Sequence, residues 1–238
     1  MNALDNLKVK IYADGADRDG MLEMYAKPYI QGFTTNPTLM KKAGITDYKA
    51  FAHEILQAIP DRPISFEVFA DEFSGMERQA LEIKTWGENV YVKIPVSNTR
   101  QEMAYDLIAR LSGAGVHLNV TAILTLEQVQ NVADALKDGP DSIVSVFAGR
   151  IADTGLDPVP IMQEALTLLK VAPKAELLWA SPREVLNIYQ ADNIGCHIIT
   201  ATNDLIRKLA LGGKDLAEYS LETVQMFYDD AQSAGYTL

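Results

Sequence analysis

A repeated alternation of short apolar segments with longer helical segments constrains the fold of this chain more than any other feature. Eight short segments are rich in apolar and β-branched residues: Val9–Ala13, Ile30–Thr34, Ile64–Phe69, Val90–Ile94, Val116–Ala122, Ile143–Phe147, Glu176–Trp179 and His197–Ile199. Repeated β–α units with short connections predict a parallel sheet. Eight units within 238 residues favour an α/β fold of the TIM barrel type, a closed (β/α)8 barrel.

The segments between these strands have the apolar spacing of helices. They include Asp47–Ile59, Gly75–Lys84, Thr99–Ser112, Leu126–Leu136, Pro158–Leu169 and Pro182–Gln190. A doubly wound sheet is the alternative, but no GxGxxG turn follows the first strand. No linker divides the chain, so residues 1–238 are predicted to form one domain. An additional C-terminal helix, Leu221–Ser233, is expected to pack over one end of the barrel or onto a neighbouring subunit.

Charge and composition argue against several kinds of partner. A formal net charge of −11 is unsuited to nucleic acid, although a few arginines inside a pocket can still bind an anion. Met1–Asp5 lacks the regions of a signal peptide, and no apolar run approaches the ~18 residues of a membrane span, so a cytoplasmic protein is expected. The single cysteine, Cys196, and three scattered histidines predict neither a disulfide nor a metal site.

Polar side chains stand at or just after the ends of the predicted strands, where barrel enzymes of this type carry their active sites. The candidate site residues are Asp14, Thr34, Asn36, Glu67, Lys93, Asn119, Thr121, Ser145, Phe147, Arg150, Ser181 and Arg183. Taken singly, most of the neutral polar residues are as well explained as turn or capping residues. Together they suit the recognition of a hydroxyl-rich ligand.

Lys93 is the most informative of these residues because it interrupts the apolar segment Val90–Val96. Lysine is rarely buried, so the alternative is a lysine at a strand edge that extends to solvent. Burial in a dry barrel favours the neutral amine, which attacks ketones and forms an iminium ion. An iminium ion accepts electrons from the adjacent C–C bond and permits its cleavage.

Two carboxylates and two arginines complete the hypothesis. Asp14 and Glu67 suit proton transfer, although Asp14 also fits a turn and Glu67 also fits an outward-facing strand position. Arg150 and Arg183, with the hydroxyl of Ser181, suit a phosphate monoester. The alternative for Arg183 is a surface position in the first turn of a helix after Pro182.

Several segments of the chain resemble the transaldolase family, which includes the fructose-6-phosphate aldolases, and in length the chain is similar to the small members. The matching segments are Gly32–Pro37, Val92–Pro95, Phe147–Ile151 and Ala180–Arg183, with weaker support from Tyr12–Asp14 and Phe66–Val68. Asn119–Leu124 and Pro182 depart from the family pattern.

The resemblance implies a role for each matching position. Lys93 would form the Schiff base, Asp14 would move the proton of the C4 hydroxyl, and Glu67 with Thr121 would act through a water. Donor-sugar contacts would come from Thr34, Asn36, Asn119, Ser145 and Phe147, and phosphate contacts from Arg150, Ser181 and Arg183. It further implies sugar-phosphate substrates of the pentose phosphate pathway, no cofactor, and a homo-oligomer.

Three functions remain open on the sequence. One is a transaldolase that transfers a dihydroxyacetone unit between sugar phosphates, and another is a fructose-6-phosphate aldolase that releases this unit. Glu67 and Phe147 form the pair that the resemblance associates with transfer, where the aldolases have glutamine and tyrosine. A non-catalytic sugar-phosphate-binding barrel is the third, and the combination of a lysine, two carboxylates and two arginines argues against it.

Overall fold

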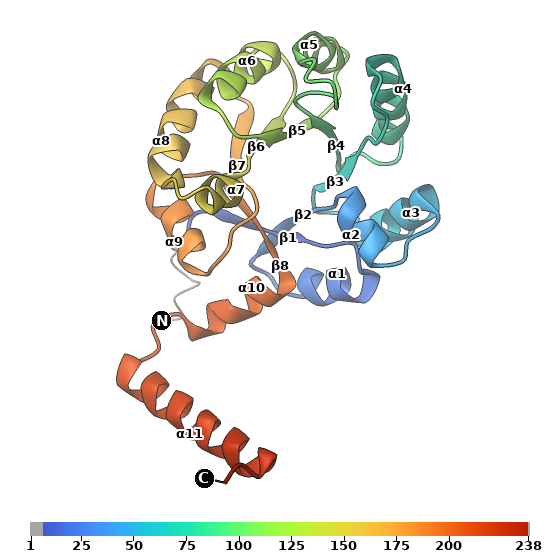
Figure 1. The fold of residues 1–238 in the computed structure, drawn as a ribbon. Coiled ribbons are helices and arrows are strands. Elements are labelled where there is room, and N and C mark those ends of the chain that lie inside the picture. The colour runs from blue at the N-terminus through green and yellow to red at the C-terminus, as the bar shows by residue number, and fades with distance from the viewer. Residues whose placement is uncertain (1–6, 238) are drawn as a thin grey trace.

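The computed structural model describes residues 7–237. Eight strands form a closed barrel in chain order, and every neighbouring pair is parallel (Figure 1). They are β1 (Lys10–Asp14), β2 (Ile30–Thr34), β3 (Ile64–Glu67), β4 (Val90–Pro95), β5 (Leu118–Ile123), β6 (Ser142–Val146), β7 (Ala175–Trp179) and β8 (Ile198–Thr202). The predicted (β/α)8 barrel is therefore confirmed.

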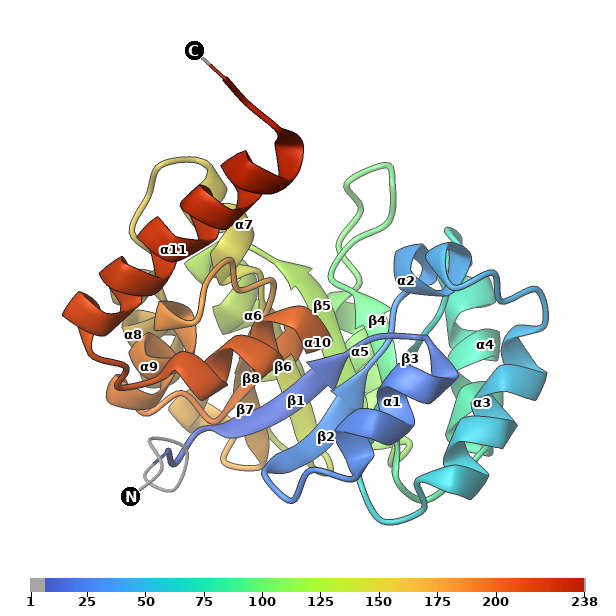
Figure 2. The ribbon, with the colours of Figure 1, turned by 90° about the horizontal axis from the view of Figure 1, so that it is seen from below.

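Helices surround the barrel, and one helix extends away from it (Figures 1 and 2). The α-helices are α1 (Arg18–Tyr25), α2 (Pro37–Lys42), α3 (Tyr48–Ala58), α4 (Phe73–Lys84), α5 (Tyr105–Gly113), α6 (Leu126–Leu136), α7 (Ala148–Asp153), α8 (Pro158–Leu168), α9 (Leu186–Asn193), α10 (Asn203–Arg207) and α11 (Leu216–Ala234). Two short 3₁₀ helices, η2 (Leu169–Val171) and η3 (Lys208–Leu211), follow α8 and α10.

The barrel has two cores because successive residues of a strand face opposite sides. In β1, Ile11 and Ala13 join the large apolar cluster between the strands and the helices. Tyr12, between them, belongs to a smaller cluster inside the barrel with Ile143, Leu178, Ala180 and Ile198. Polar residues that share the inward-facing positions are thereby directed into the barrel, above this inner apolar layer.

Three boundaries within the barrel differ by three or more residues from the prediction, and hydrogen bonds explain two of them. The helix predicted from Thr99 begins at Tyr105, because Thr99 instead donates two hydrogen bonds to Asp71. The helix predicted from Pro182 begins at Leu186, since the amides of Arg183 and Glu184 donate to the side chain of Asn187. Strand β8 continues past its predicted end to Thr202.

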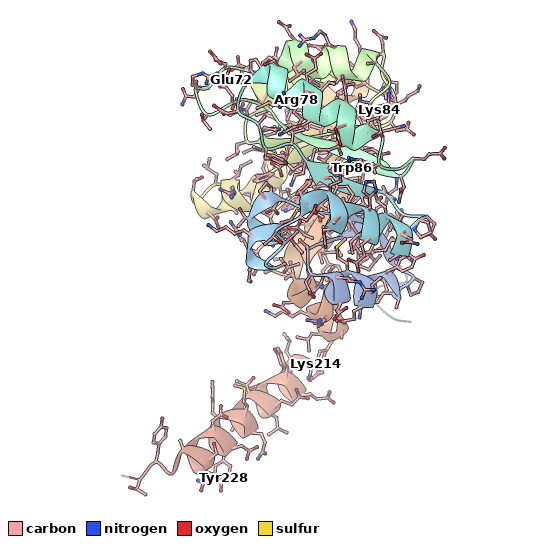
Figure 3. The ribbon with its side chains drawn as sticks, turned by 90° about the vertical axis from the view of Figure 1, so that its right-hand side faces the viewer. Glu72, Arg78, Lys84, Trp86, Lys214 and Tyr228 are labelled. Carbon is pink, nitrogen blue, oxygen red and sulfur yellow. The ribbon has the colours of Figure 1, made fainter. Side chains whose placement is uncertain are left out.

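The additional C-terminal helix is longer than predicted and does not pack over an end of the barrel. α11 spans 19 residues, begins after the capping residue Asp215 and ends at Gly235, which has a φ of 67°. None of its residues is buried. Figure 3 shows α11 projecting from the barrel beyond Lys214, with Tyr228 near its far end. No helix among residues 7–237 combines the length and apolar character that a membrane span needs.

Candidate active site

A cavity of about 440 Å³ opens at the carboxyl ends of the strands. Ten of the twelve predicted site residues line it: Asp14, Thr34, Asn36, Glu67, Lys93, Thr121, Ser145, Phe147, Arg150 and Ser181. Asn119 and Arg183 are not among the lining residues. The parallel register explains the convergence, because it places the same end of every strand at one face of the barrel.

Lys93 lies inside this cavity and is only 7% exposed, so it does not extend to solvent. Its Nζ donates to the backbone carbonyl of Thr35 at 3.0 Å and lies 3.1 Å from Oε2 of Glu67. Glu67 and Lys93 are register partners on β3 and β4, which brings both side chains to the same height in the barrel. Glu67 therefore faces inward, and one carboxylate oxygen is within proton-transfer distance of the amine.

Asp14 stands on β1 and also lines the cavity. Its Oδ1 accepts a hydrogen bond of 2.7 Å from the hydroxyl of Thr34, which lies 2.5 Å from the hydroxyl of Thr200. Burial raises the pKa of Asp14, while the charge of Lys93 and the Thr34 hydrogen bond oppose this rise. A carboxylate with a raised pKa is a stronger base than an exposed one.

Asn119 is not among the residues that line the cavity, and it is completely buried although it is the register partner of Lys93. Its Nδ2 donates to the hydroxyl of Ser65 at 2.9 Å, and its Oδ1 accepts from Ser145 at 2.7 Å. Both ends of the amide are thus used within the protein. The structure places Asn119 as a support for Ser145, which does line the cavity.

Thr121 presents a free hydroxyl at the cavity. It is buried, and among residues 7–237 its Oγ1 has no hydrogen-bond partner. The pairing of β5 with β6 shifts register between Val120 and Ile123, and Ala122 has a φ of 62°, a left-handed conformation that is rare outside glycine. An unpaired buried hydroxyl beside a cavity suits a bound water.

The wall formed by α7 and the loop after β7 carries Arg150, Phe147 and Ser181. The guanidinium carbon of Arg150 lies 5.4 Å from the centre of the Phe147 ring. Gly149 allows the close approach of the two segments, because a Cβ there would lie 1.5 Å from the carbonyl oxygen of Ser181. This tight contact positions the Ser181 segment next to Arg150.

Arg183 is directed elsewhere. Its Nε donates to Oδ1 of Asp153 at 2.9 Å, and its Nη2 pairs with the other oxygen of the same carboxylate. The side chain is half exposed. Arg183 therefore lies in the loop before α9 and is engaged by α7, and the structure does not bring it to the cavity with Arg150.

Sequence reasoning missed two groups that shape the site. Thr200 lines the cavity and contacts Thr34, and it went unnoticed because β8 was ended at Ile199. A hydroxyl inside the apolar segment Ile198–Ala201 is a signal that could have revealed it. The backbone carbonyl of Thr35 could not be recognised from the sequence, because every residue has a backbone carbonyl.

No group of three or more His, Cys, Asp or Glu side chains within residues 7–237 is arranged to hold a metal ion.

These features define a class of protein: a (β/α)8 barrel whose carboxyl-end cavity combines a buried amine, two carboxylates and an arginine. The model of the transaldolase/fructose-6-phosphate aldolase family matches residues 11–238. The chain therefore belongs to this family of aldolase-type enzymes.

Individual relatives agree with this assignment. A probable transaldolase of Dehalococcoides mccartyi is 31% identical over 202 residues, covering 84% of this chain and 90% of the relative. A probable transaldolase of Methanococcus maripaludis is 34% identical over 202 residues, covering 84% and 89%. Among solved structures, 3-keto-L-gulonate-6-phosphate decarboxylase of Vibrio cholerae has a TM-score of 0.54 at 13% identity, covering 86% of this chain and 97% of the other. At that identity the likeness concerns the fold alone.

Proposed function

We propose that this enzyme is a transaldolase that uses Lys93 to transfer a dihydroxyacetone unit from a ketose phosphate to an aldose phosphate. Fructose 6-phosphate and sedoheptulose 7-phosphate are the donors that we propose. The observation that carries the proposal is the position of the Lys93 amine, which is buried in the cavity 3.1 Å from Glu67. The family assignment and the resemblance of the strand-end segments support the same reaction.

In the first step, the neutral amine of Lys93 attacks the C2 carbonyl of the ketose and gives a carbinolamine. Loss of the C2 hydroxyl as water then yields the iminium ion. Glu67 is the group that supplies and removes protons in this step, through a water held by the unpaired hydroxyl of Thr121. The ion pair with Glu67 also stabilises the positive charge of the iminium nitrogen.

In the second step, Asp14 removes the proton of the C4 hydroxyl. The O–H electron pair becomes the new carbonyl bond, and the electrons of the C3–C4 bond move to the iminium nitrogen. An aldose phosphate leaves, and the three-carbon unit remains on Lys93 as an enamine. The acceptor aldose then reacts with the enamine by the reverse sequence, with Asp14 returning the proton.

The phosphate group of the substrate requires a local positive charge in a chain of net charge −11. Arg150 meets this requirement, since it lines the cavity and forms no ion pair with a carboxylate within the described residues 7–237. Ser181 adds a hydroxyl on the same wall. Arg183 can join them only by exchanging its bond to Asp153 for a bond to phosphate.

Phe147 supports transfer over release of free dihydroxyacetone. Its ring lines the cavity and offers no hydroxyl to position a hydrolytic water beside the enamine. A fructose-6-phosphate aldolase, the alternative, must protonate and hydrolyse that enamine. We therefore expect glyceraldehyde 3-phosphate to be released from fructose 6-phosphate much faster with erythrose 4-phosphate than without it. Phe147→Tyr should raise the acceptor-free rate several-fold, and equal rates in the wild type would favour the aldolase.

We also propose that the enzyme works as a homo-oligomer in which a second copy covers α11. Residues 217, 221, 224, 228 and 231 share one face of this helix, and they are all apolar. Most helical stability in proteins comes from tertiary packing of an apolar face, and no residue of α11 is buried.

Covalent trapping tests the central proposal. The protein is incubated with fructose 6-phosphate, reduced with borohydride and measured by intact mass and peptide mapping. A reduced adduct on the peptide that contains Lys93 is the expected result. No adduct, or an adduct on another lysine, would remove the Schiff-base mechanism.

A further inference from the structure

Thr200 takes no part in the proposed reaction, yet it contacts Thr34, which is hydrogen-bonded to the proposed base Asp14. It stands on β8, is 6% exposed and lines the cavity. Its Oγ1 lies 2.5 Å from Oγ1 of Thr34, and Thr34 in turn lies 2.7 Å from Oδ1 of Asp14. Three side chains from three adjacent strands thus form one continuous chain of hydrogen bonds.

The chemistry of the groups fixes the direction of this chain. An ionised carboxylate is an acceptor only, so Thr34 must donate its single proton to Asp14. The contact between the two hydroxyls is then possible only if Thr200 donates to Thr34. A donor that itself accepts a hydrogen bond is polarised and becomes a stronger donor, most of all toward a charged acceptor.

We propose that Thr200 is a positioning residue that acts on Asp14 through Thr34. By donating to Thr34 it fixes the rotation of that hydroxyl and strengthens the hydrogen bond that Asp14 accepts in its ionised form. No proton passes along the chain, and only the orientation of two hydroxyl groups is involved. This inference rests on the proposed function, in which ionised Asp14 removes the proton of the C4 hydroxyl.

Charged groups on other elements also face Asp14 and must stay constant in any test. Inside the cavity they are Lys93, Glu67 and Arg150. Asp14 also borders a second, wider hollow whose charged side chains are Asp17, Asp19, Glu23, Lys42, Asp204 and Arg207. A substitution at Thr200 leaves all of them in place, so a changed pH profile would report on the hydrogen-bond chain.

The test compares Thr200→Val, which keeps the shape and removes the hydroxyl, with Thr200→Ser, which restores it. For cleavage and transfer with fructose 6-phosphate, we expect Thr200→Val to lower kcat/KM by about two- to tenfold, the range of one neutral hydrogen bond. The acidic limb of its pH profile should move to higher pH, because ionised Asp14 is less stabilised. Thr200→Ser should restore both kcat/KM and the position of the acidic limb of the pH profile.

Two controls separate this role from a structural one and from the proposed function. Thr202→Val makes the same change two residues along β8, where the side chain makes no capping hydrogen bond, and should leave the acidic limb in place. Borohydride trapping of dihydroxyacetone on Lys93 requires no C4 proton and should be retained in Thr200→Val. A limb that stays in place in Thr200→Val, or a defect that Thr200→Ser does not repair, would overturn the inference alone. Absence of the dihydroxyacetone adduct in the wild type would overturn the proposed function and this inference together.

Discussion

In most proteins charged residues are exposed and apolar residues are buried. The cavity at the carboxyl ends of the strands, here called the mouth of the barrel, and helix α11 depart from this distribution in opposite ways. At the mouth, Lys93, Asp14 and Glu67 carry charge into a largely enclosed cavity, and each has a partner within 3.1 Å. On α11, apolar side chains remain in solvent: Val224 is 61% exposed and Tyr228 is 60% exposed. The first region buries charge, and the second exposes apolar surface.

The difference shows what each region requires to be stable. The charges at the mouth are held by contacts from neighbouring strands of the same chain. No residue among 7–237 buries the apolar face of α11, and exposed apolar surfaces often mark contacts with other molecules. We therefore propose that the cavity is the site of chemistry and that α11 is the site of assembly.

The strongest test of the mouth is the loss of its amine. Lys93→Met should abolish the borohydride adduct and reduce turnover by at least about 10⁴-fold, because no other lysine among residues 7–237 lines the cavity. Lys10→Met is the matched control, since Lys10 also pairs with a glutamate, Glu176, but on strands β1 and β7 away from the cavity lining. Intact mass and steady-state rates measure both effects. A Lys93→Met enzyme with near wild-type turnover would rule out Lys93 as the nucleophile.

A smaller effect is expected from the arginines of the mouth. Arg150→Ala should lower kcat/KM for fructose 6-phosphate by about 10- to 100-fold, the cost of a charge-assisted hydrogen bond to phosphate. Arg183→Ala should cost less, because that side chain is engaged by Asp153 outside the cavity. Unphosphorylated dihydroxyacetone should be used almost equally by both variants. Equal losses with phosphorylated and unphosphorylated substrates would show that the arginines are structural.

These two arginines also show how far the sequence predicts the site. The alternation of apolar segments fixes the barrel, and a barrel brings strand ends together, so Lys93, Glu67 and Asp14 were predictable as neighbours. The loops are different. Arg183 was placed with Arg150 by motif, but its direction depends on Asp153, which lies 30 positions away in the chain. Hydrogen bonds between loops leave no periodic pattern in a sequence.

Asn119 and Thr200 show the same limit inside the barrel. Asn119 lies within a predicted strand and Thr200 lies beyond the predicted end of β8, and strand periodicity does not predict which inward-facing residues line the cavity. Asn119 is enclosed by hydrogen bonds with Ser65 and Ser145, whereas Thr200 lines the cavity. Which inward-facing residue reaches the cavity is thus a tertiary property.

The assembly proposed for α11 can be broken with a single charge. Val224→Glu places a carboxylate in the centre of the apolar face, and we expect it to reduce the molar mass measured by light scattering toward that of one chain. Gln225→Glu adds the same group about 100° round the helix from Val224, outside the apolar face, and should leave the assembly intact. If Val224→Glu has the same mass as the wild type, α11 is not the contact. A monomeric wild type would reject the proposed oligomer itself.

The smallest expected effect concerns the stability that ionised Asp14 removes from the fold. Burial raises the pKa of Asp14 above its unfolded value, so the folded state favours the protonated form. The ionised carboxylate therefore opposes folding increasingly as the pH rises above the unfolded pKa of about 3.9, and this effect is complete once the pH exceeds the folded pKa. Asp14→Asn should accordingly raise Tm near neutral pH by a few degrees, on a scale where ~1 kcal/mol corresponds to about 2–4 °C. Thermal unfolding between acidic and neutral pH measures this gain, which should shrink as the pH falls toward the unfolded pKa.

A gain in Tm that stays constant with pH would show that packing of the amide, rather than removal of the buried charge, is responsible. Loss of turnover together with a pH-dependent gain in Tm would identify Asp14 as a charge that the barrel holds for its chemistry at a cost in stability.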